Sequence, residues 1–167
     1  MKKLFFVALL WLFFAFPAST GAVNVSGNSA TLKSKELASQ EIDERVLILQ
    51  SFLQEKDSPL TAFAADFVQV ADKNKLDWRL LPAIAGLESS FGKRLIVGSF
   101  NPFGWGGGYI YFASWKDGFE KVARGLNKTP YPENKSPQKL GPVYAPPNPK
   151  WGYLIANIMD QVYPSSR

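Results

Sequence analysis

Apolar residues at helical spacing predict two consecutive helices before residue 75. Between Glu36 and Glu55, four apolar residues recur every three or four positions, opposite charged and amide side chains: Ile42, Val46, Leu49 and Leu53. This pattern ends at Asp57, and the following Ser58 is a good N-cap before Pro59, which suits the first position of a new helix. We expect the second helix to run to about Lys73 and to bury Phe63, Phe67 and Val70.

Residues 80–92 predict a third helix that is apolar almost all round. It begins between Asp77 and Pro82 and ends near Gly92, which can adopt the left-handed conformation of a helix cap. A helix of this composition is expected at the centre of the fold. A glycine-rich aromatic loop over residues 98–108 follows, and the sequence Tyr-Ile-Tyr-Phe at residues 109–112 predicts a short strand.

Two further helices are predicted in the last third of the chain. Ser114 is placed to cap one of them, with Asp117 at its third position, and this helix ends near Asn127. The proline-rich residues 129–149 predict mainly irregular structure, and a last helix runs roughly from Lys150 to Val162. The predicted fold is therefore mainly α, with helices around one buried helix and a small aromatic loop or hairpin.

The first residues have the features of an export signal. Lys2 and Lys3 precede an apolar run that ends at small residues, so residues 1–22 are predicted to be a signal peptide. The alternative is an uncleaved membrane tether through residues 4–23, because this run approaches the ~20 residues that span a bilayer. Residues 23–40 are predicted to be a linker, and residues 41–167 a single domain. In both cases we expect the domain outside the cytoplasm, as a secreted, periplasmic or cell-surface protein.

The composition restricts the chemistry that the chain can perform. It contains no Cys and no His, which excludes thiol nucleophiles, disulfides, Ser-His and Cys-His arrangements and nearly all zinc sites. Acid–base catalysis then depends chiefly on carboxyl groups, and we expect neither a metal nor a cofactor. The net charge of +5 favours polyanions such as cell-wall polymers. No dense Lys/Arg run or nucleic-acid motif is present, so nucleic acid is not an expected partner.

Glu88 is the only charged residue between Leu80 and Gly92, and it falls within the apolar stripe of the predicted helix. A carboxyl group in apolar surroundings resists ionisation and can keep a proton for transfer to a leaving oxygen. That is what a glycosidase requires of its general acid. Two other interpretations remain open: Glu88 points to water at the rim of the core, or it forms an ion pair with a nearby cation, Arg79, Lys93 or Arg94.

No acidic residue occurs between Glu88 and Asp117. Most glycosidases use two neighbouring carboxyl groups, so the second must come from a distant segment or be absent. If it is absent, the 2-acetamido oxygen or the 6-hydroxyl of the sugar must replace it. Muramic acid in peptidoglycan carries both groups, so a single carboxyl group favours amino-sugar polymers as substrates.

Four motifs in this order resemble the lysozyme-like superfamily. Residues 83–89 read Ala-Ile-Ala-Gly-Leu-Glu-Ser, and residues 101–106 read Asn-Pro-Phe-Gly-Trp-Gly. Residues 111–118 match the pattern Phe-x-Ser-x-x-Asp-Gly that precedes the next helix, and residues 143–146 place a Tyr before Ala-Pro. The nearest resemblance is to bacterial endo-β-N-acetylglucosaminidase-like (mannosyl-glycoprotein endo-β-N-acetylglucosaminidase-like) domains, over residues 58–162.

This resemblance implies an α+β lysozyme-like fold and a peptidoglycan-cleaving enzyme, with glycan strands as its partner. Glu88 would be the general acid, and Tyr144 would position or stabilise the reacting sugar. Ser89 would brace the helix or the acid. The expected substrate-binding residues are Ser89, Asn101, Phe103, Gly104, Trp105 and Tyr111, although Trp105 and Tyr111 could equally be core residues. We expect a monomer.

Two departures from the family leave the reaction open. The segment before the Tyr is short and proline-rich over residues 129–140, and no second carboxyl group matches a family motif. The enzyme could thus be a hydrolase of glucosaminidase or muramidase type, or a lytic transglycosylase, and the linkage is not assigned. The alternatives to an enzyme are a non-catalytic wall-binding module, which an ion-paired Glu88 outside any cleft would indicate, and a membrane-tethered interaction protein.

Overall fold

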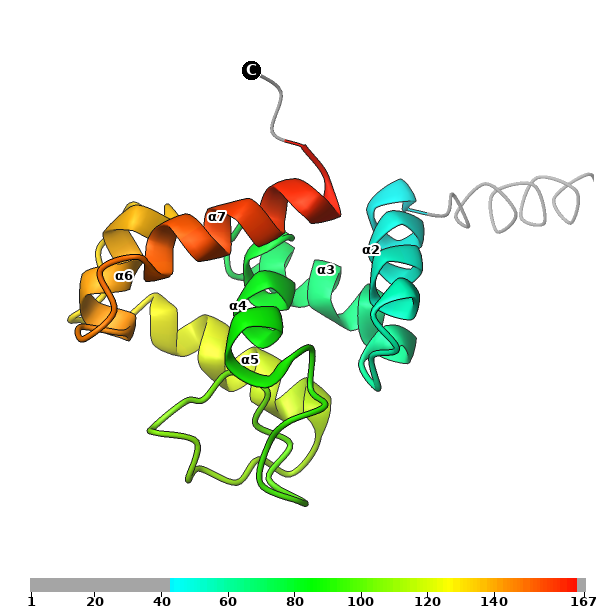
Figure 1. Ribbon diagram of the computed structural model, residues 1–167, viewed down its shortest axis with the longest axis horizontal. Coiled ribbons are helices and arrows are strands. Elements are labelled where there is room, and N and C mark those ends of the chain that lie inside the picture. Colours follow the sequence, from blue (N-terminus) through cyan, green and yellow to red (C-terminus); the bar gives the residue numbers. More distant parts are fainter. Residues whose placement is uncertain (1–42, 165–167) are drawn as a thin grey trace, which may run out of the picture. The chain divides into compact units, whose positions relative to one another are not determined.

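A computed structural model describes residues 43–164 of the chain, which lie within a unit spanning Glu41–Arg167 (Figure 1). The predicted leader, the linker and the start of the helix expected from Glu36 lie outside the described residues. The elements are α2 (Glu44–Glu55), the 3₁₀ turn η1 (Thr61–Phe63), α3 (Ala64–Lys73), α4 (Leu80–Ser89), α5 (Trp115–Leu126), α6 (Pro137–Tyr144) and α7 (Trp151–Val162). The prediction of a mainly α fold is confirmed. None of these helices is long and apolar enough to cross a bilayer.

Of the two predicted caps, Ser114 caps a helix and Ser58 does not. The Ser58 hydroxyl accepts the Leu60 N–H at 3.0 Å and donates to the Phe91 carbonyl at 2.8 Å, so it fixes a turn. The chain then forms η1, whose N-cap is Leu60, and α3 begins at Ala64 after Phe63. Ser114 caps α5 by accepting the Asp117 N–H at 3.2 Å.

One predicted element is wrong. Residues 109–112 do not form a strand, and the described residues contain none. Phe112 donates one backbone hydrogen bond to Ser99 (2.8 Å), whereas a ladder needs repeated pairs, and Tyr109 and Tyr111 are 79% and 60% exposed. The proline-rich residues 129–149 are mainly irregular, as predicted, but they include one short helix, α6. Its Pro137 occupies the first helical turn, where the missing N–H costs no hydrogen bond.

Helix α4 lies between α7 and α3 and contacts both (Figure 1). Its residues Leu80 to Ala85 are buried, which confirms a largely apolar, central helix. α7 also packs against α6 and α2, and α3 packs against α2 and α5. The Phe67 and Phe119 rings stack at 3.9 Å between α3 and α5. The long loop between α4 and α5 begins at the carboxyl end of α4, where Glu88 lies.

The contact between α6 and α7 depends on a glycine. A Cβ added to Gly152 would lie 2.7 Å from the Cα of Gln138 and 2.8 Å from the carbonyl oxygen of Pro137, both of which are backbone atoms. A Cβ on Gly141, in the same contact, would meet its nearest atom at an ordinary 3.4 Å. These two helices carry Trp151 and Tyr144, so their separation affects the site described below.

We predict that Gly152→Ala lowers the free energy of unfolding by about 1–3 kcal/mol, because overpacking forces the two backbones apart. Gly141→Ala is the matched control, and we expect it to be neutral or stabilising by up to ~1 kcal/mol, since alanine favours a helix interior. Urea denaturation of both variants measures the difference. Equal losses of stability would contradict the close contact at Gly152.

Candidate active site

The carboxyl end of α4 presents Glu88 to solvent. The helix ends at Ser89, three residues before the predicted cap, because Ser90, Phe91 and Gly92 all have positive φ (52°, 60° and 83°). This reversal folds the Phe91 ring back onto Gly86, where a Cβ would lie 2.5 Å from it. Glu88 is therefore exposed on the last turn of the helix. The expectation that it lies buried within the apolar stripe is wrong, because the stripe reaches the edge of the core at Leu87.

Glu88 lines a pocket of about 490 Å³ at this end of α4. Arg94, Ile96, Gly104 and Tyr109 also line it, and Glu88 is the only lining residue with a carboxyl group. Within residues 43–164, Glu88 forms no ion pair. The possible ion pair with Arg79, Lys93 or Arg94 is therefore absent from these residues. The alternative in which the Glu88 carboxylate points to water agrees with the structure, which adds that the carboxylate lines a pocket.

One carboxylate oxygen of Glu88 is held by a tryptophan. The Trp151 indole Nε1–H donates to Glu88 Oε1 at 2.8 Å, although Trp151 itself is 1% exposed at the start of α7. The other oxygen, Oε2, faces Gly104: a Cβ added there would lie 3.1 Å from it, and Gly104 has φ of 61°. Glycine therefore satisfies both the backbone conformation and the close approach to the carboxylate.

Two buried polar side chains hold the wall of this pocket. The Asn101 amide nitrogen donates to the carbonyls of Trp105 (2.9 Å) and Ile110 (3.0 Å), and its oxygen accepts the Trp105 N–H at 3.1 Å. The Ser89 hydroxyl lies 2.7 Å from the Pro102 carbonyl and accepts the Gly92 N–H at 2.9 Å. Asn101 thus holds the loop together and Ser89 joins it to α4, so both side chains are engaged in the protein rather than free for a ligand.

The other predicted substrate-binding residues divide into core and surface. Phe103 is a core residue, because its ring is fully buried and packs edge-on against Phe119 with centroids 5.7 Å apart. Gly104 lies at the carboxylate, as predicted. Trp105 is half-buried behind the loop, and Tyr111 is exposed but does not line the pocket. Tyr109, two residues earlier, lines it instead.

Tyr144 belongs to an aromatic cluster with Trp105, Tyr131 and Trp151. Its ring stacks on Trp151 at 4.7 Å, and Trp105 stacks on Tyr131 at 5.8 Å. The Tyr144 hydroxyl donates to the Phe103 carbonyl at 2.6 Å, so it is already bound by the loop. Burial, with smaller contributions from the charge of Glu88 and from Tyr131, raises the pKa of the Tyr144 phenol well above 10.

Sequence reasoning missed Trp151, Arg94 and Tyr109. Trp151 begins a predicted helix, and an apolar residue at that position is expected to be part of the core. Glu88 precedes it by 63 residues, so no local sequence pattern connects the two. Arg94 could be recognised only as a cation near Glu88. The sequence predicts a strand at Tyr109, and a strand prediction gives no sign that this side chain lines a pocket with Glu88. The Asn-Pro-Phe-Gly motif did predict that Gly104 lies opposite Glu88.

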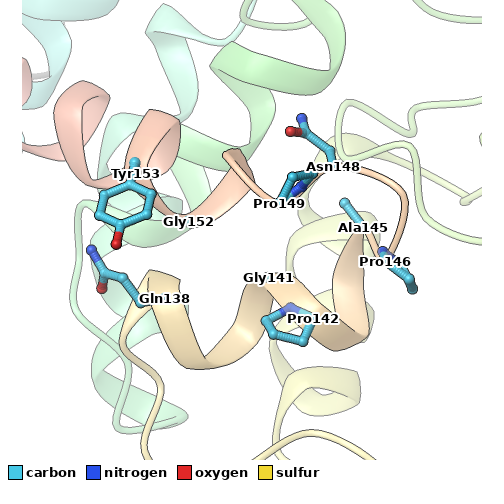
Figure 2. Close-up of a pocket in the computed structure, with 9 residues that line it drawn as sticks. All are labelled: Gln138, Gly141, Pro142, Ala145, Pro146, Asn148, Pro149, Gly152 and Tyr153. Carbon is cyan, nitrogen blue, oxygen red and sulfur yellow. The ribbon is translucent and has the colours of Figure 1, made fainter.

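A second pocket, of about 290 Å³, lies between α6 and the start of α7 (Figure 2). Figure 2 shows Tyr153 and Gln138 on one side and Asn148 with Pro146 and Pro149 on the other. Its lining has no carboxyl group and no cation. It therefore lacks an acid for glycoside cleavage, and the pocket at Glu88 is the better candidate.

Within residues 43–164, no group of three or more Asp or Glu side chains is placed to hold a metal ion. No model of a known protein family, no curated protein and no solved structure matches the chain. The assignment of a function to this pocket therefore depends on its own geometry and on the motifs.

We predict that Tyr144 makes the protein less stable at alkaline pH. The folded protein holds the phenol proton more tightly than the unfolded chain does, so this contribution is fully present below about pH 10 and is lost as the pH rises further. Tyr144→Phe should lower stability at neutral pH by about 1 kcal/mol, through the lost hydrogen bond, but should decline less steeply above pH 10.

Urea midpoints between pH 7 and 11 measure this effect. Tyr153→Phe, at a tyrosine that is 70% exposed, is the matched control and should keep the pH dependence of the wild type. The buried environment of Tyr144 would be disproved if the two variants and the wild type declined in parallel.

Proposed function

We propose that this protein is a glycosidase that cleaves the glycan strands of peptidoglycan, with Glu88 as its general acid. The observation that carries the proposal is the arrangement of the Glu88 carboxyl group: it opens into a pocket, it has no ion-pair partner within residues 43–164, and Trp151 holds one of its oxygens. A carboxyl group that only stabilised the fold would be expected to have a charged partner or to point away from a cavity.

The hydrogen bond from Trp151 decides which oxygen of Glu88 can carry a proton. An indole N–H can only donate, so Oε1 accepts it, and the proposal assigns the transferred proton to Oε2, the oxygen without this donor. This oxygen faces the Gly104 backbone at the pocket. In this proposal a sugar bound beside Gly104 receives the proton from Oε2, as general acid catalysis requires.

With one carboxyl group in the pocket, the substrate supplies the nucleophile. Glu88 transfers its Oε2 proton to the glycosidic oxygen as the bond from C1 to that oxygen breaks, and the 2-acetamido oxygen of the sugar attacks C1. Water then opens the cyclic intermediate and gives a proton back to the Glu88 carboxylate, which completes hydrolysis. If the 6-hydroxyl of muramic acid attacks C1 in place of water, its proton passes to the Glu88 carboxylate, the bond from C1 to the acetamido oxygen breaks, and a 1,6-anhydro sugar is released.

Tyr144 acts in this proposal as a positioning residue. Its hydroxyl is bound to the Phe103 carbonyl, next to Gly104, and its ring supports Trp151. It therefore stabilises both groups that contact the Glu88 carboxylate. The proposed relation to the lysozyme-like superfamily and its endo-β-N-acetylglucosaminidase-like domains is supported by the order of the four motifs and by the placement of Glu88 and Gly104.

The proposed location, outside the cytoplasm, is supported by the leader-like residues 1–22. The alternative of a non-catalytic, membrane-tethered wall-binding module is less well supported, because its expected sign was an ion-paired Glu88 outside any cleft. We also propose that the protein acts as a monomer without a cofactor.

We predict that Glu88→Gln lowers the rate of peptidoglycan cleavage by ~10²-fold or more, because glutamine preserves the shape but has no acidic proton. Release of fragments from purified peptidoglycan by the full chain, followed by mass spectrometry, measures this. Glu120→Gln, which removes only an exposed ion pair with Arg124, is the control and should keep full activity.

Reducing ends or 1,6-anhydro ends on the products separate hydrolysis from transglycosylation. If the wild type binds peptidoglycan but does not cleave it, the protein is a wall-binding module and the glycosidase proposal is wrong. Equal cleavage by wild type and Glu88→Gln would show that Glu88 is not the acid.

We predict that Trp151→Phe lowers kcat by about 10-fold with little change in KM, because the carboxyl group loses the donor that orients it. Trp115→Phe, which truncates a tryptophan that packs on Phe100 away from the pocket, is the matched control and should leave kcat unchanged. Steady-state kinetics and thermal midpoints are measured for both. If kcat fell only in proportion to the folded fraction, Trp151 would be a core residue alone.

A further inference from the structure

Arg94 is a cation without a protein partner in the same pocket as Glu88. It is exposed, lines that pocket, and its guanidinium forms no hydrogen bond or ion pair within residues 43–164. The other arginines in that range are all paired with carboxylates: Arg45 with Asp43 and Asp72, Arg79 with Asp77, and Arg124 with Glu120. Arg94 therefore has its binding capacity free for a ligand.

The backbone of Arg94 is fixed relative to Glu88. Its N–H donates to the Ser89 carbonyl at 2.8 Å, directly after the left-handed turn that ends α4. The Ser89 side chain is in turn bound to the loop at Pro102. The stem of Arg94 is thus anchored one residue from the catalytic position, while its long side chain can adjust at the pocket.

The chemistry of the pocket favours a ligand with a carboxylate. A guanidinium binds a carboxylate through two parallel hydrogen bonds, which a neutral hydroxyl or acetamido group cannot reproduce. Glu88 is the only acid in the lining and Arg94 its only cation, so Arg94 is the one charged group there that attracts an anionic ligand. The remaining lining includes Ile96 and Tyr109, which offer apolar surface to the face of a sugar ring.

We infer that Arg94 binds a carboxylate carried by the sugar next to the scissile bond, so that the enzyme prefers acidic amino-sugar polymers to neutral poly-N-acetylglucosamine. This inference rests on the proposed function and narrows its substrate class. The carboxylate has two sources in peptidoglycan: the lactyl ether of a peptide-free muramic acid, or the peptide attached to that ether. Both present the same chemistry to the guanidinium.

Binding measurements test the inference apart from catalysis. The full chain carrying Glu88→Gln, with and without Arg94→Gln, is titrated calorimetrically with three tetrasaccharides. One is neutral chitotetraose, one alternates N-acetylglucosamine with peptide-free muramic acid, and one carries the peptide. We expect Arg94→Gln to weaken binding of at least one acidic tetrasaccharide by about 10-fold or more, as loss of a charged hydrogen-bonded pair should, and to leave chitotetraose unchanged.

Lys93→Gln is the matched control, because it removes the same charge one residue away. Lys93 does not line the pocket, and its Nζ donates to the Lys56 carbonyl at 2.6 Å. Its substitution should leave all three affinities unchanged. Arg94→Lys should recover only part of the lost affinity, since an ammonium lacks the planar pair of donors. Which acidic tetrasaccharide responds identifies the source of the carboxylate.

The outcomes separate this inference from the proposed function. Equal weakening by Arg94→Gln and Lys93→Gln, or equal weakening for neutral and acidic glycans, would overturn the role of Arg94 while cleavage by the wild type stood. If acidic glycans bind selectively but the wild type does not cleave peptidoglycan, the proposed role of Arg94 is supported and the proposed glycosidase function is wrong. If none of the three tetrasaccharides bound, both proposals would fail.

Discussion

The hydrogen bond between the Trp151 indole and Glu88 is the interaction on which the candidate site depends. It joins the first residue of α7 to the last turn of α4, two helices that also pack along their lengths. Because Trp151 is almost fully buried, its N–H has a fixed direction, and it imposes that direction on a carboxyl group that is itself exposed. A rigid donor from the core thus orders a side chain at the surface.

The opposite wall of the pocket achieves order in a different way. The loop from residue 101 to residue 110 has no regular secondary structure. The Asn101 side chain instead forms hydrogen bonds to two backbone carbonyls and one backbone N–H of the same loop. Ser89 and Tyr144 then attach the loop at Pro102 and Phe103, from α4 and α6. Gly104 follows directly, so the backbone at the carboxylate is held from both sides.

The sequence predicted most of the helical fold because local signals decided it. Ser114 caps α5 through its own side chain, and the apolar composition of residues 80–85 requires burial. The exposure of Glu88 could not be predicted, because three residues of left-handed backbone end α4 earlier than Gly92 alone indicated. The strand expected over residues 109–112 did not form because aromatic and β-branched residues favour a strand only where a partner strand can pair with it. The places of Trp151 and Arg94 beside Glu88 could not be predicted either. They depend on contacts between segments that are far apart in the sequence or lie outside helices, and no local sequence pattern encodes such contacts.

The occupied hydroxyl of Tyr144 limits the chemistry that this pocket can perform. A phenol whose pKa is raised by burial keeps its proton and is not available as a phenolate base, and losing that proton would remove the hydrogen bond that holds the loop. The lining offers no second carboxyl group. In the proposed glycosidase reaction, a nucleophile or base other than Glu88 would therefore come from the substrate or from water. The proposal then favours a sugar with its own internal nucleophile. The proposed role of Arg94 favours a sugar that also carries a negative charge, and muramic acid meets both conditions.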